Sequence, residues 1–578
     1  MKEIIQQLIK ENLPDEVDFI VEHPTELKHG DYSTNVALVL AQKNGGNPRE
    51  IAEGLLKKIQ QNSGKDFEKI EIAGPGFINF FLNRDFFKKS VQQVLNGEIH
   101  YGRNKELAGK NIIIEFTDPN PFKPLHIGHL MSNSIGESVA RILEWNGATV
   151  TRVCYQGDVG LHVAKALWGM KQNTADVPKD SATLAEKTEY LGKVYTFGAD
   201  KYDSDEKAKA EINEINKRVY NLFDEDEKND DLNIRAAYKK GREWSLMHFN
   251  QIYEKLGSTF AELIFEHETA KSGSEIVREN VPAVFELSDG AVVYRGEKDG
   301  LHTRVFINSM GLPTYESKDI GLAFYKEDVL QKKFGHFDAS VVITAVEQRE
   351  YYKVVLAALK KLRPEIAEKT LHITHGLMRF AEGKMSSRLG NVITGESLLS
   401  EIEDLVLEKI KDRGFDLREA DEIKETVAVA ALKYSILKQA IGRDIIFDRD
   451  AAVSFEGDSG PYLQYTYVRT KSIIDSAKEK KVKFVEAIEP TNWQTTDLER
   501  LFYRFPEEVK NAYTGVLSPQ NITTLLTKIA GEFNSFYAKN KILDDGPNEA
   551  YKVALTKAVM HIIQNGLKIL GMKVPNRM

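Results

Sequence analysis

The sequence predicts a multidomain α/β protein, with a small α/β domain first, a core built on a parallel sheet, and an all-α helical bundle last. Its length of 578 residues is several times that of a typical domain of roughly 100–200 residues. Strand and helix patterns alternate between residues 111 and 362, whereas the pattern after residue 446 is almost wholly helical. Alternation of this kind is typical of a parallel sheet covered by helices.

Residues 1–95 are predicted to form the small α/β domain. Met1–Glu11 is amphipathic, and helical spacing of apolar residues recurs in Asn35–Gln42 and Ile51–Ile59. The apolar run Phe77–Leu82 follows a Gly-Pro-Gly turn and is expected to be a strand. From these patterns alone, the segment would be an accessory folding domain.

The core is predicted to span residues 96–365 and to begin with a strand–loop–helix–strand unit. Asn111–Ile114 and Thr149–Tyr155 have the composition of buried strands, and Leu130–Asn146 has the spacing of a helix. Prolines at 119, 121 and 124 require an irregular loop before that helix. Ligands bind at the carboxyl ends of parallel strands, and phosphates favour helix N-termini. The loop is therefore a candidate site.

Two histidines and a glycine stand where this loop passes into the helix. His126 and His129 are three residues apart, so in a first helical turn they share a face. Two imidazoles there can donate hydrogen bonds to phosphoryl oxygens in a transition state. Gly128 leaves room for a flat ring against the backbone. Taken alone, the pattern is equally compatible with a loop that merely contains two histidines.

A second half of the core repeats the alternation of strands and helices. Glu316–Tyr325 and Tyr351–Leu362 are predicted helices on either side of a predicted strand, Ala339–Ala345. The repeat predicts a Rossmann-like core. Residues from about 176 to 300 are richer in charge and are expected to be an insertion. The candidate strands in and near it are Phe260–Phe265, Ala291–Tyr294 and Val305–Asn308.

Helical patterns dominate the rest of the chain. Residues 366–445 contain Lys384-Met385-Ser386 between two glycines, which predicts a loop whose lysine can reach phosphate. Helices are expected at Glu401–Lys411 and Ile423–Gln439, and residues 446–578 are expected to form the helical bundle.

Composition restricts the class of protein. No apolar run approaches the roughly 18 residues that span a bilayer, and the first residues do not have the pattern of a secretory signal. The single cysteine, Cys154, excludes internal disulfides and a multi-cysteine zinc site, and we expect it to be a small core residue. A cytoplasmic protein is expected. The net charge of -8 neither requires nor excludes an RNA partner, because basic residues can gather on one face.

Taken together, the motifs carry a resemblance to a known family. The HIGH sequence at 126–129, followed by the KMS loop at 384–386, resembles the class I aminoacyl-tRNA synthetases. The flanking sequence EFTDPNPFKPL, from residue 115, resembles arginyl-tRNA synthetases. So do HGDYSTNVA from residue 29, AGPGFIN from residue 73 and GPYLQY from residue 460. The resemblance covers essentially the whole chain.

The resemblance implies activation of L-arginine with ATP to arginyl-adenylate, followed by its transfer to the terminal adenosine of tRNA(Arg). It implies an N-terminal domain at the tRNA elbow, a catalytic core, a KMS and stem-contact region, and an anticodon-binding bundle. Mg²⁺ is expected with ATP, no protein-bound zinc or other metal site is expected, and a monomer is expected.

The resemblance also assigns roles to individual residues. The implied catalytic residues are His126, His129, Lys384 and Lys123. The implied arginine-binding residues are Glu115, Phe116, Asn120, His126, Tyr315 and Asp319. The implied ATP-binding residues are Pro119, His126, Gly128, His129, Lys384, Met385 and Ser386. The implied tRNA contacts are Arg469, Tyr537 and Met578.

The chain departs from the family pattern in two places near the proposed substrates. Ser387 stands where the loop usually has a second lysine, and we expect Lys123, rather than Arg388, to replace that cation. Lys353 stands where the family usually has an arginine-binding glutamine, so that contact stays unassigned, with Gln348 the nearest glutamine.

Three alternatives share part of the pattern. A class I synthetase for another amino acid would keep HIGH and KMS but not the Glu115, Asn120, Tyr315 and Asp319 set. A small nucleotidylyltransferase would not need the helical segment after residue 446. A non-catalytic tRNA-binding relative would tend to lose the histidines and Lys384, which are present here.

Overall fold

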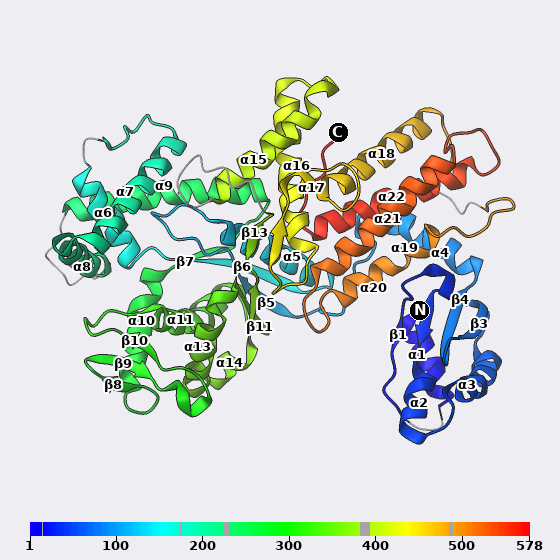
Figure 1. The fold of residues 1–578 in the computed structure, drawn as a ribbon, viewed down its shortest axis with the longest axis horizontal. Helices are drawn as coiled ribbons and strands as arrows, with labels where there is room; N and C mark the ends of the chain where they lie inside the picture. The colour runs from blue at the N-terminus through cyan, green and yellow to red at the C-terminus, as the bar shows by residue number, and fades with distance from the viewer. Residues whose placement is uncertain (14–15, 174–175, 224–231, 382–393, 485–488) are drawn as a thin grey trace. The chain divides into compact units, whose positions relative to one another are not determined.

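The computed structural model describes residues 1–13, 16–173, 176–223, 232–381, 394–484 and 489–578 (Figure 1). The chain forms two compact units. The first unit comprises Met1–Gly102, Thr466–Glu508 and Leu525–Asn565. The second unit comprises Arg103–Tyr465, Val509–Thr524 and Gly566–Met578.

The first unit contains a four-stranded antiparallel sheet in the order β1-β2-β4-β3. Its strands are β1 (Val21–Glu22), β2 (Tyr32–Thr34), β3 (Phe67–Ala73) and β4 (Phe77–Leu82). The helices beside it are α1 (Lys2–Glu11), α2 (Val36–Asn44), α3 (Pro48–Asn62) and α4 (Arg84–Gly97). Ile5, Ile59 and Phe80 are fully buried in the shared core. The predicted α/β character of this segment is confirmed.

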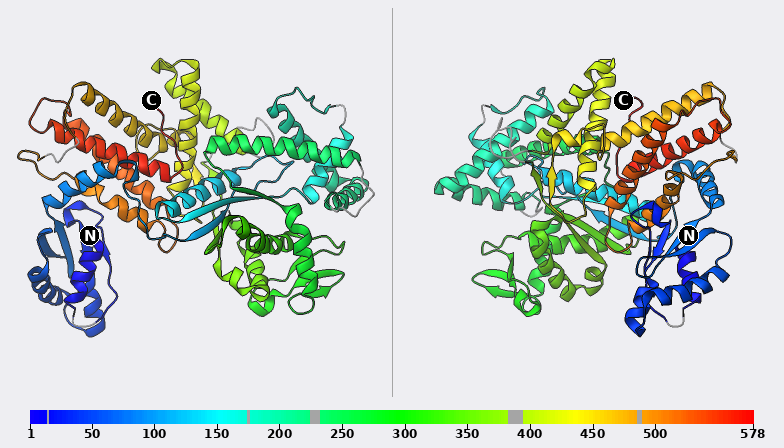
Figure 2. Two further views of the ribbon diagram at one scale, coloured as in Figure 1. Left: turned by 180° about the vertical axis from the view of Figure 1, so that it is seen from behind. Right: turned by 45° about the vertical axis from the view of Figure 1, so that its right-hand side comes forward.

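Helices make up most of the C-terminal part of the chain, which confirms the predicted all-α bundle (Figure 2). They are α18 (Gly460–Glu479), α19 (Glu499–Phe502), α20 (Arg504–Asn511), α21 (Pro519–Lys539) and α22 (Glu549–Ile569).

The second unit is built on a five-stranded sheet in the order β12-β11-β5-β6-β7, in which every neighbouring pair is parallel. Its strands are β5 (Asn111–Glu115), β6 (Thr149–Gln156), β7 (Glu262–Phe265), β11 (Ala339–Ala345) and β12 (Thr370–His375). The strand order reverses between β5 and β11, which is where ligands bind in doubly wound folds. The predicted Rossmann-like core is confirmed.

Helices connect these strands and carry the candidate site residues. They are α5 (Ile127–Trp145), α6 (Leu161–Gln172), α10 (Glu266–Glu279), α11 (Tyr315–Tyr325), α12 (Gln331–Phe334), α13 (Arg349–Leu362) and α14 (Pro364–Lys369). A π-helical turn, η5 (Lys326–Leu330), follows α11. Ile113 and Ile114 of β5 lie in the buried centre of the sheet, as their β-branched run predicts.

The stretch predicted as an insertion contains three long helices that the charge-rich sequence did not reveal: α7 (Leu184–Ser204), α8 (Glu206–Asn221) and α9 (Leu232–Leu256). Strand β7 also lies in this stretch, but it pairs with β6 and so belongs to the core sheet. A separate antiparallel sheet is made of β8 (Glu286–Ser288), β9 (Ala291–Tyr294) and β10 (Arg304–Ile307).

After the core, β13 (Met378–Phe380) pairs with β14 (Ile445–Phe447). Two helices lie between these strands in the sequence, α15 (Gly395–Ile410) and α16 (Leu417–Leu437), and one helix follows them, α17 (Arg449–Ala452). Both helices predicted here are confirmed, although each begins about six residues earlier than the apolar spacing indicated. Among the described helices, none has both the length and the apolar character needed to cross a membrane.

Candidate active site

The loop between β5 and α5 has a strained backbone. Thr117, Asp118 and Phe122 have φ angles of 82°, 46° and 69°, a region that residues other than glycine rarely adopt. The N–H of Thr117 donates to Ser132 Oγ at 3.0 Å, and the N–H of Tyr155 donates to Asp118 Oδ1 at 2.7 Å. Contacts of this kind hold a strained loop in place, and such loops concentrate at functional sites.

His126 and His129 lie face to face at the start of α5. Their ring centroids are 3.7 Å apart, and the rings are inclined by 24°. The N–H of His126 donates to Nδ1 of His129 at 3.1 Å, so Nε2 of His129 carries the proton when the ring is neutral. A Cβ at Gly128 would lie 2.9 Å from Cε1 of His126. The glycine therefore leaves room for the imidazole of His126.

The surroundings keep both histidines neutral. Burial lowers the pKa of His129 well below its ordinary value, and the charges of His126 and Lys123 add to the effect. Burial and Lys123 also lower the pKa of His126. A neutral imidazole with its proton on Nε2 is a hydrogen-bond donor that brings no permanent charge.

Lys123 lies in the loop ahead of these histidines, with Nζ 5.2 Å from the centre of the Tyr195 ring. Burial lowers its pKa, and the Glu266 carboxylate acts in the opposite direction. The positive charge of Lys123 lowers the pKa of both His126 and His129.

Acidic side chains gather beside the carboxyl end of β5. Glu115 is buried and forms an ion pair with Lys326 of η5. Glu266, at the start of α10, is buried and forms an ion pair with Lys318 of α11. The Tyr351 hydroxyl donates to Asp319.

The electrostatics of this acidic group favour an added cation. Burial raises the pKa of Asp319 well above its ordinary value, and the charges of Glu115 and Glu266 raise it further. Burial and Glu115 likewise raise the pKa of Asp118. A positive group placed among these carboxylates would lower their pKa values and would itself be stabilised.

Tyr315 and Asp319 are one helical turn apart in α11, as predicted from their spacing. Tyr315 is 55% exposed, and Lys318 Nζ lies 4.4 Å from the centre of its ring. Asn120 lies in the loop, where a Cβ at Gly157 would come within 2.2 Å of its Oδ1. The glycine therefore allows the Asn120 amide to approach the end of β6.

Phe116 and Pro119 are buried, and this restricts what they can contact. The Phe116 ring packs on Gly136 of α5, where an added Cβ would lie 2.2 Å away, and its centroid is 4.9 Å from that of Phe260. The side chain of Phe116 is fully buried, so only its backbone could face a substrate.

Lys353, which stands at the position of the family glutamine, forms an ion pair with Glu350 at 2.7 Å. Its side chain is 50% exposed. It is therefore partnered on its own helix, and the expected glutamine contact remains unassigned for both Lys353 and Gln348.

Several residues at the site were not found from the sequence. They are Asp118, Glu266, Lys318, Lys326 and Tyr351. Asp118 could have been found, because an acidic residue directly after a predicted strand is itself a signal. The others come from segments more than a hundred residues away from the HIGH motif, and their local sequence gives no indication that they belong to the site.

The predicted tRNA contacts belong to different units. Arg469 Nη1 donates to Asn534 Oδ1 at 2.5 Å, and its guanidinium lies 5.3 Å from the centre of the Tyr537 ring. Tyr537 is 41% exposed. The structure thus brings Arg469 and Tyr537 together in the first unit, while Met578 belongs to the second unit.

The predicted KMS loop, with Lys384, Met385, Ser386, Ser387 and Arg388, lies outside the described residues. Among the residues that are described, no three or more histidine, cysteine, aspartate or glutamate side chains form a group that could hold a metal ion. Cys154 is buried and free, as predicted.

Family models match the chain in three consecutive segments. Residues 90–449 match tRNA synthetases class I (R), catalytic domain. Residues 1–82 match the arginyl tRNA synthetase N terminal domain, and residues 463–578 match the DALR anticodon binding domain.

Whole-chain relatives agree with these matches. The arginine–tRNA ligase of Lactobacillus delbrueckii subsp. bulgaricus is 30% identical over 100% of both chains, and that of Clostridium perfringens is 28% identical over 100% of both. Among solved structures, Thermus thermophilus arginyl-tRNA synthetase has a TM-score of 0.76 at 21% identity, covering 100% of this chain and 99% of that one. The Plasmodium falciparum enzyme has a TM-score of 0.75 at 21% identity, covering 100% of this chain and 98% of the other.

The catalytic-domain match covers most of the chain, and the similarity to curated relatives runs from end to end. The parallel sheet, the stacked histidines of the HIGH motif and the acidic group beside them lie within that matched segment. The chain belongs to the arginyl-tRNA synthetases, which are class I aminoacyl-tRNA synthetases.

Proposed function

We propose that this chain is an arginine–tRNA ligase, an ATP-dependent enzyme of protein synthesis. In the first step, an oxygen of the arginine carboxylate attacks the α-phosphate of ATP, and pyrophosphate leaves. In the second step, a hydroxyl of the terminal adenosine of tRNA(Arg) attacks the carbonyl carbon, and AMP leaves. The observation that carries the proposal is geometric: His126 and His129 stack at the start of α5, and buried carboxylates, including Glu115 and Glu266, gather beside the carboxyl end of β5.

Recognition of arginine follows from charge and shape. A guanidinium is planar and permanently charged, and carboxylates bind it strongly when they can accept two parallel hydrogen bonds. In our assignment Asp319 receives the guanidinium, with Tyr315 beside it. Glu115 and Asn120 hold the α-amino end, and His126 together with the backbone of Phe116 completes the site. Uncharged analogues are rejected because buried carboxylates would be left without a partner.

ATP is assigned to the loop and the first turn of α5. His126 and His129 donate to phosphate oxygens, Gly128 allows close approach of the backbone, and Pro119 helps to shape the loop. Lys123 supplies the positive charge near the leaving pyrophosphate. Lys384, Met385 and Ser386 are assigned to the same substrate from the sequence alone.

Mg²⁺ is proposed to arrive with the phosphates of ATP, where it would neutralise charge on the leaving group. The chain's own share of the chemistry is positioning and hydrogen-bond donation, with little covalent work. We further propose a monomer in the cytoplasm.

The tRNA is proposed to contact several parts of the chain. Residues 1–95 are assigned to the tRNA elbow, 96–365 to catalysis, 366–445 to the stem-contact region and 446–578 to the anticodon. Arg469, Tyr537 and Met578 are assigned to anticodon-loop contacts, where aromatic rings stack on splayed bases. The contact between Arg469 and Tyr537 supports a joint role for these two.

The test is a charging assay with purified protein, purified tRNA(Arg), ATP and each of the 20 amino acids. We expect arginine alone to be attached to tRNA. Charging with another amino acid would indicate a synthetase of different specificity, and tRNA binding without charging would indicate a non-catalytic relative.

A further inference from the structure

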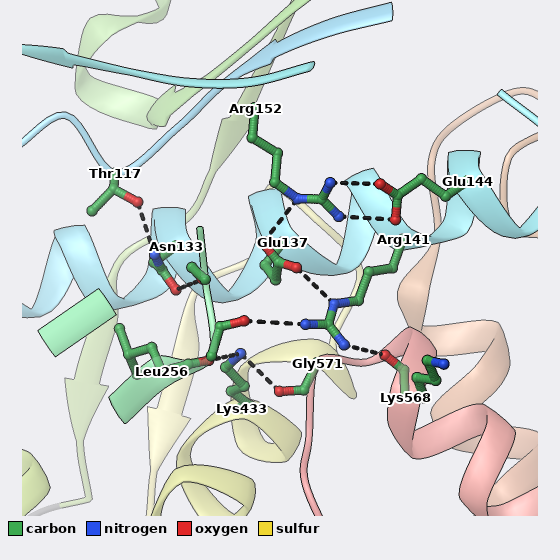
Figure 3. A network of polar contacts seen from close by, with 12 residues as sticks. Thr117, Asn133, Glu137, Arg141, Glu144, Arg152, Leu256, Lys433, Lys568 and Gly571 are labelled. Atoms are coloured by element: carbon green, nitrogen blue, oxygen red, sulfur yellow. Dashed lines mark hydrogen bonds and ion pairs between the residues drawn. The ribbon is translucent and has the colours of Figure 1, made fainter. Parts of the chain in front are cut away.

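Helix α5 carries the HIGH histidines at its start and a buried ionic group in its middle. Glu137, which is 2% exposed, accepts from Nε of Arg141 at 2.6 Å and from Nε of Arg152 at 3.1 Å. Arg152 also donates to both oxygens of Glu144, at 2.6 and 3.0 Å. Figure 3 shows Glu137 between the two guanidinium groups. This group fixes α5 to strand β6, which carries Arg152.

Two cationic side chains at this ionic group, Lys433 and Arg141, bind the C-terminal ends of α9 and α22. Lys433 of α16 donates to the carbonyl oxygens of Leu256 at 2.7 Å and Gly571 at 2.9 Å. Arg141 donates to the carbonyl oxygens of Lys568 at 2.9 Å and Gly257 at 3.1 Å (Figure 3). These carbonyls lie at the C-terminal ends of α9 and α22, where the helix dipole is negative.

The fit around Lys433 is close. Gly571 has a φ angle of 70°, and a Cβ there would lie 2.9 Å from Lys433 Nζ and 3.5 Å from Cγ of Glu137. Lys433 is fully buried, and burial together with the charge of Arg141 lowers its pKa to about 7. Replacing a buried charged group by an apolar residue is often neutral or stabilising, so stability alone does not account for a lysine at this position.

Buried hydrogen bonds connect the chain just after α9 to the strained loop between β5 and α5. Ser258 lies two residues after the end of α9 and donates to Asn133 Oδ1 at 2.9 Å. Asn133, on α5, donates to Thr117 Oγ1 at 3.0 Å. All three side chains are buried. These hydrogen bonds therefore connect the end of α9, where Lys433 binds, to Thr117, which is the neighbour of Asp118 in the substrate loop.

We propose that Lys433 is a positioning residue for arginine activation. By hydrogen bonding to the end of α9 and to the turn after α22, it holds the loop that contains Thr117 in place. The turn after α22 thereby becomes part of the scaffold of the active site. This inference rests on the proposed function. Lys433 touches no substrate. It acts through the backbone carbonyls of Leu256 and Gly571 and, beyond them, through Ser258 and Asn133.

The first test is Lys433→Met, which keeps an unbranched side chain one atom shorter than lysine and removes the two hydrogen bonds. Lys424→Met is the matched control, because Lys424 lies on the same helix and its ion-pair partner Asp421, at 2.8 Å, is exposed. In arginine-dependent ATP–pyrophosphate exchange with tRNA(Arg) present, we expect kcat of Lys433→Met to fall by roughly 10–100-fold, as for a small misplacement of reacting groups. The KM values for ATP and arginine should change by less than about threefold, and Lys424→Met should match the wild type.

The second test changes the same contact without removing a charge. Gly571→Ala pushes a methyl group toward Lys433 Nζ, whereas Gly515→Ala introduces the same backbone strain, at a φ angle of 78°, where nothing lies within 4 Å. We expect Gly571→Ala to reproduce the loss of kcat and Gly515→Ala to leave it unchanged. This pair remains informative even if Lys433→Met does not fold.

All assays are run well below the melting temperature of each variant, which is measured in parallel. A normal kcat in folded Lys433→Met and Gly571→Ala would overturn the inference. A loss that only tracks the unfolded fraction would overturn it as well, because the role would then be structural. A wild-type protein that fails to activate arginine would contradict the proposed function instead, so the two failures are distinguishable.

Discussion

Burial decides the chemistry of individual side chains at this site. Burial raises the pKa of Asp319, and the charges of other carboxylates raise it further, whereas burial lowers the pKa of His129, and the charges of His126 and Lys123 lower it further. Asp319 is thus ready to accept a cation, and His129 is held neutral as a donor. Opposite shifts in neighbouring groups are typical of sites that bind and transform a charged substrate.

Asp319→Asn should reduce recognition of arginine, because the amide cannot balance a guanidinium charge. We expect kcat/KM for arginine to fall by the equivalent of about 2–4 kcal/mol, the usual range for removing one partner of a buried charge pair. The KM for ATP should hardly change. The control is Asp328→Asn, because Asp328 is a half-exposed carboxylate in η5. Unaltered arginine kinetics in Asp319→Asn would show that the arginine site lies elsewhere.

Lys123→Ala tests the replacement of the missing loop lysine. Losing one preorganised charged donor should lower kcat for activation by roughly 10²–10³, with a smaller change in the KM for arginine. Ser387→Lys in the Lys123→Ala background should recover part of the loss. Lys110→Ala, whose partner Asp338 lies 2.9 Å away at the surface, should behave like the wild type. If Arg388→Ala is inactive while Lys123→Ala is normal, the loop arginine is the substitute.

The pH profile tests the neutral state of His129. A histidine whose pKa is lowered on folding stays neutral until the pH falls below its folded value. Between that value and the unfolded value of about 6.5, the unfolded state binds more protons, so stability rises with pH and is complete above about 6.5. Activation measured from about pH 5 to 9 should therefore show no acid limb from this histidine near 6.5. A limb at that value that is absent in His129→Asn would contradict the assignment.

At the level of secondary structure, α10 and α11 touch through glycines, and this places the acidic group. A Cβ at Gly273 would lie 2.0 Å from the Ser317 carbonyl oxygen, and a Cβ at Gly321 would lie 2.2 Å from that of Thr269. The backbones are therefore in direct contact. The positions of Glu266, on α10, and Asp319, on α11, relative to each other depend on this close approach of the two helices.

Gly273→Ala should separate these two helices. Overpacking of this kind costs typically ~1–3 kcal/mol of folding free energy. Because α11 carries Tyr315 and Asp319, we also expect a higher KM for arginine, with the KM for ATP less affected. Gly531→Ala is the control, since Gly531 lies in α21 with nothing within 4 Å of its added Cβ. Equal unfolding temperatures and arginine kinetics in both variants would contradict the prediction.

Four of the five strands of the core sheet, β5, β6, β7 and β11, could be predicted because their apolar runs are short and end at Gly, Pro or polar residues, whereas β12 was not predicted. The face shared by His126 and His129 could also be predicted, because it depends only on helical spacing. The pairing of Glu115 with Lys326 could not, since the partners are 211 residues apart and neither has a local signal. Helices α7 to α9 were missed because their many charged residues hide the apolar stripe that packs against α6.

At the level of the whole molecule, the residues assigned to arginine and ATP belong to one compact unit, and Arg469 and Tyr537 belong to the other. The KM for tRNA and the KM for the small substrates should therefore respond to different substitutions. The difference can be tested at a single exposed ring.

Tyr537→Ala should weaken tRNA recognition without disturbing arginine or ATP. Stacking of a base on an aromatic ring contributes about 1–3 kcal/mol, so the KM for tRNA should rise by roughly 5–150-fold. Tyr537→Phe keeps the ring beside the Arg469 guanidinium and should retain most of the affinity. The KM values for ATP and arginine should match the wild type in both variants. If Tyr537→Ala charges tRNA normally, the ring only packs within the bundle; if Tyr537→Phe is as weak as Tyr537→Ala, the hydroxyl rather than the stacking surface makes the contact.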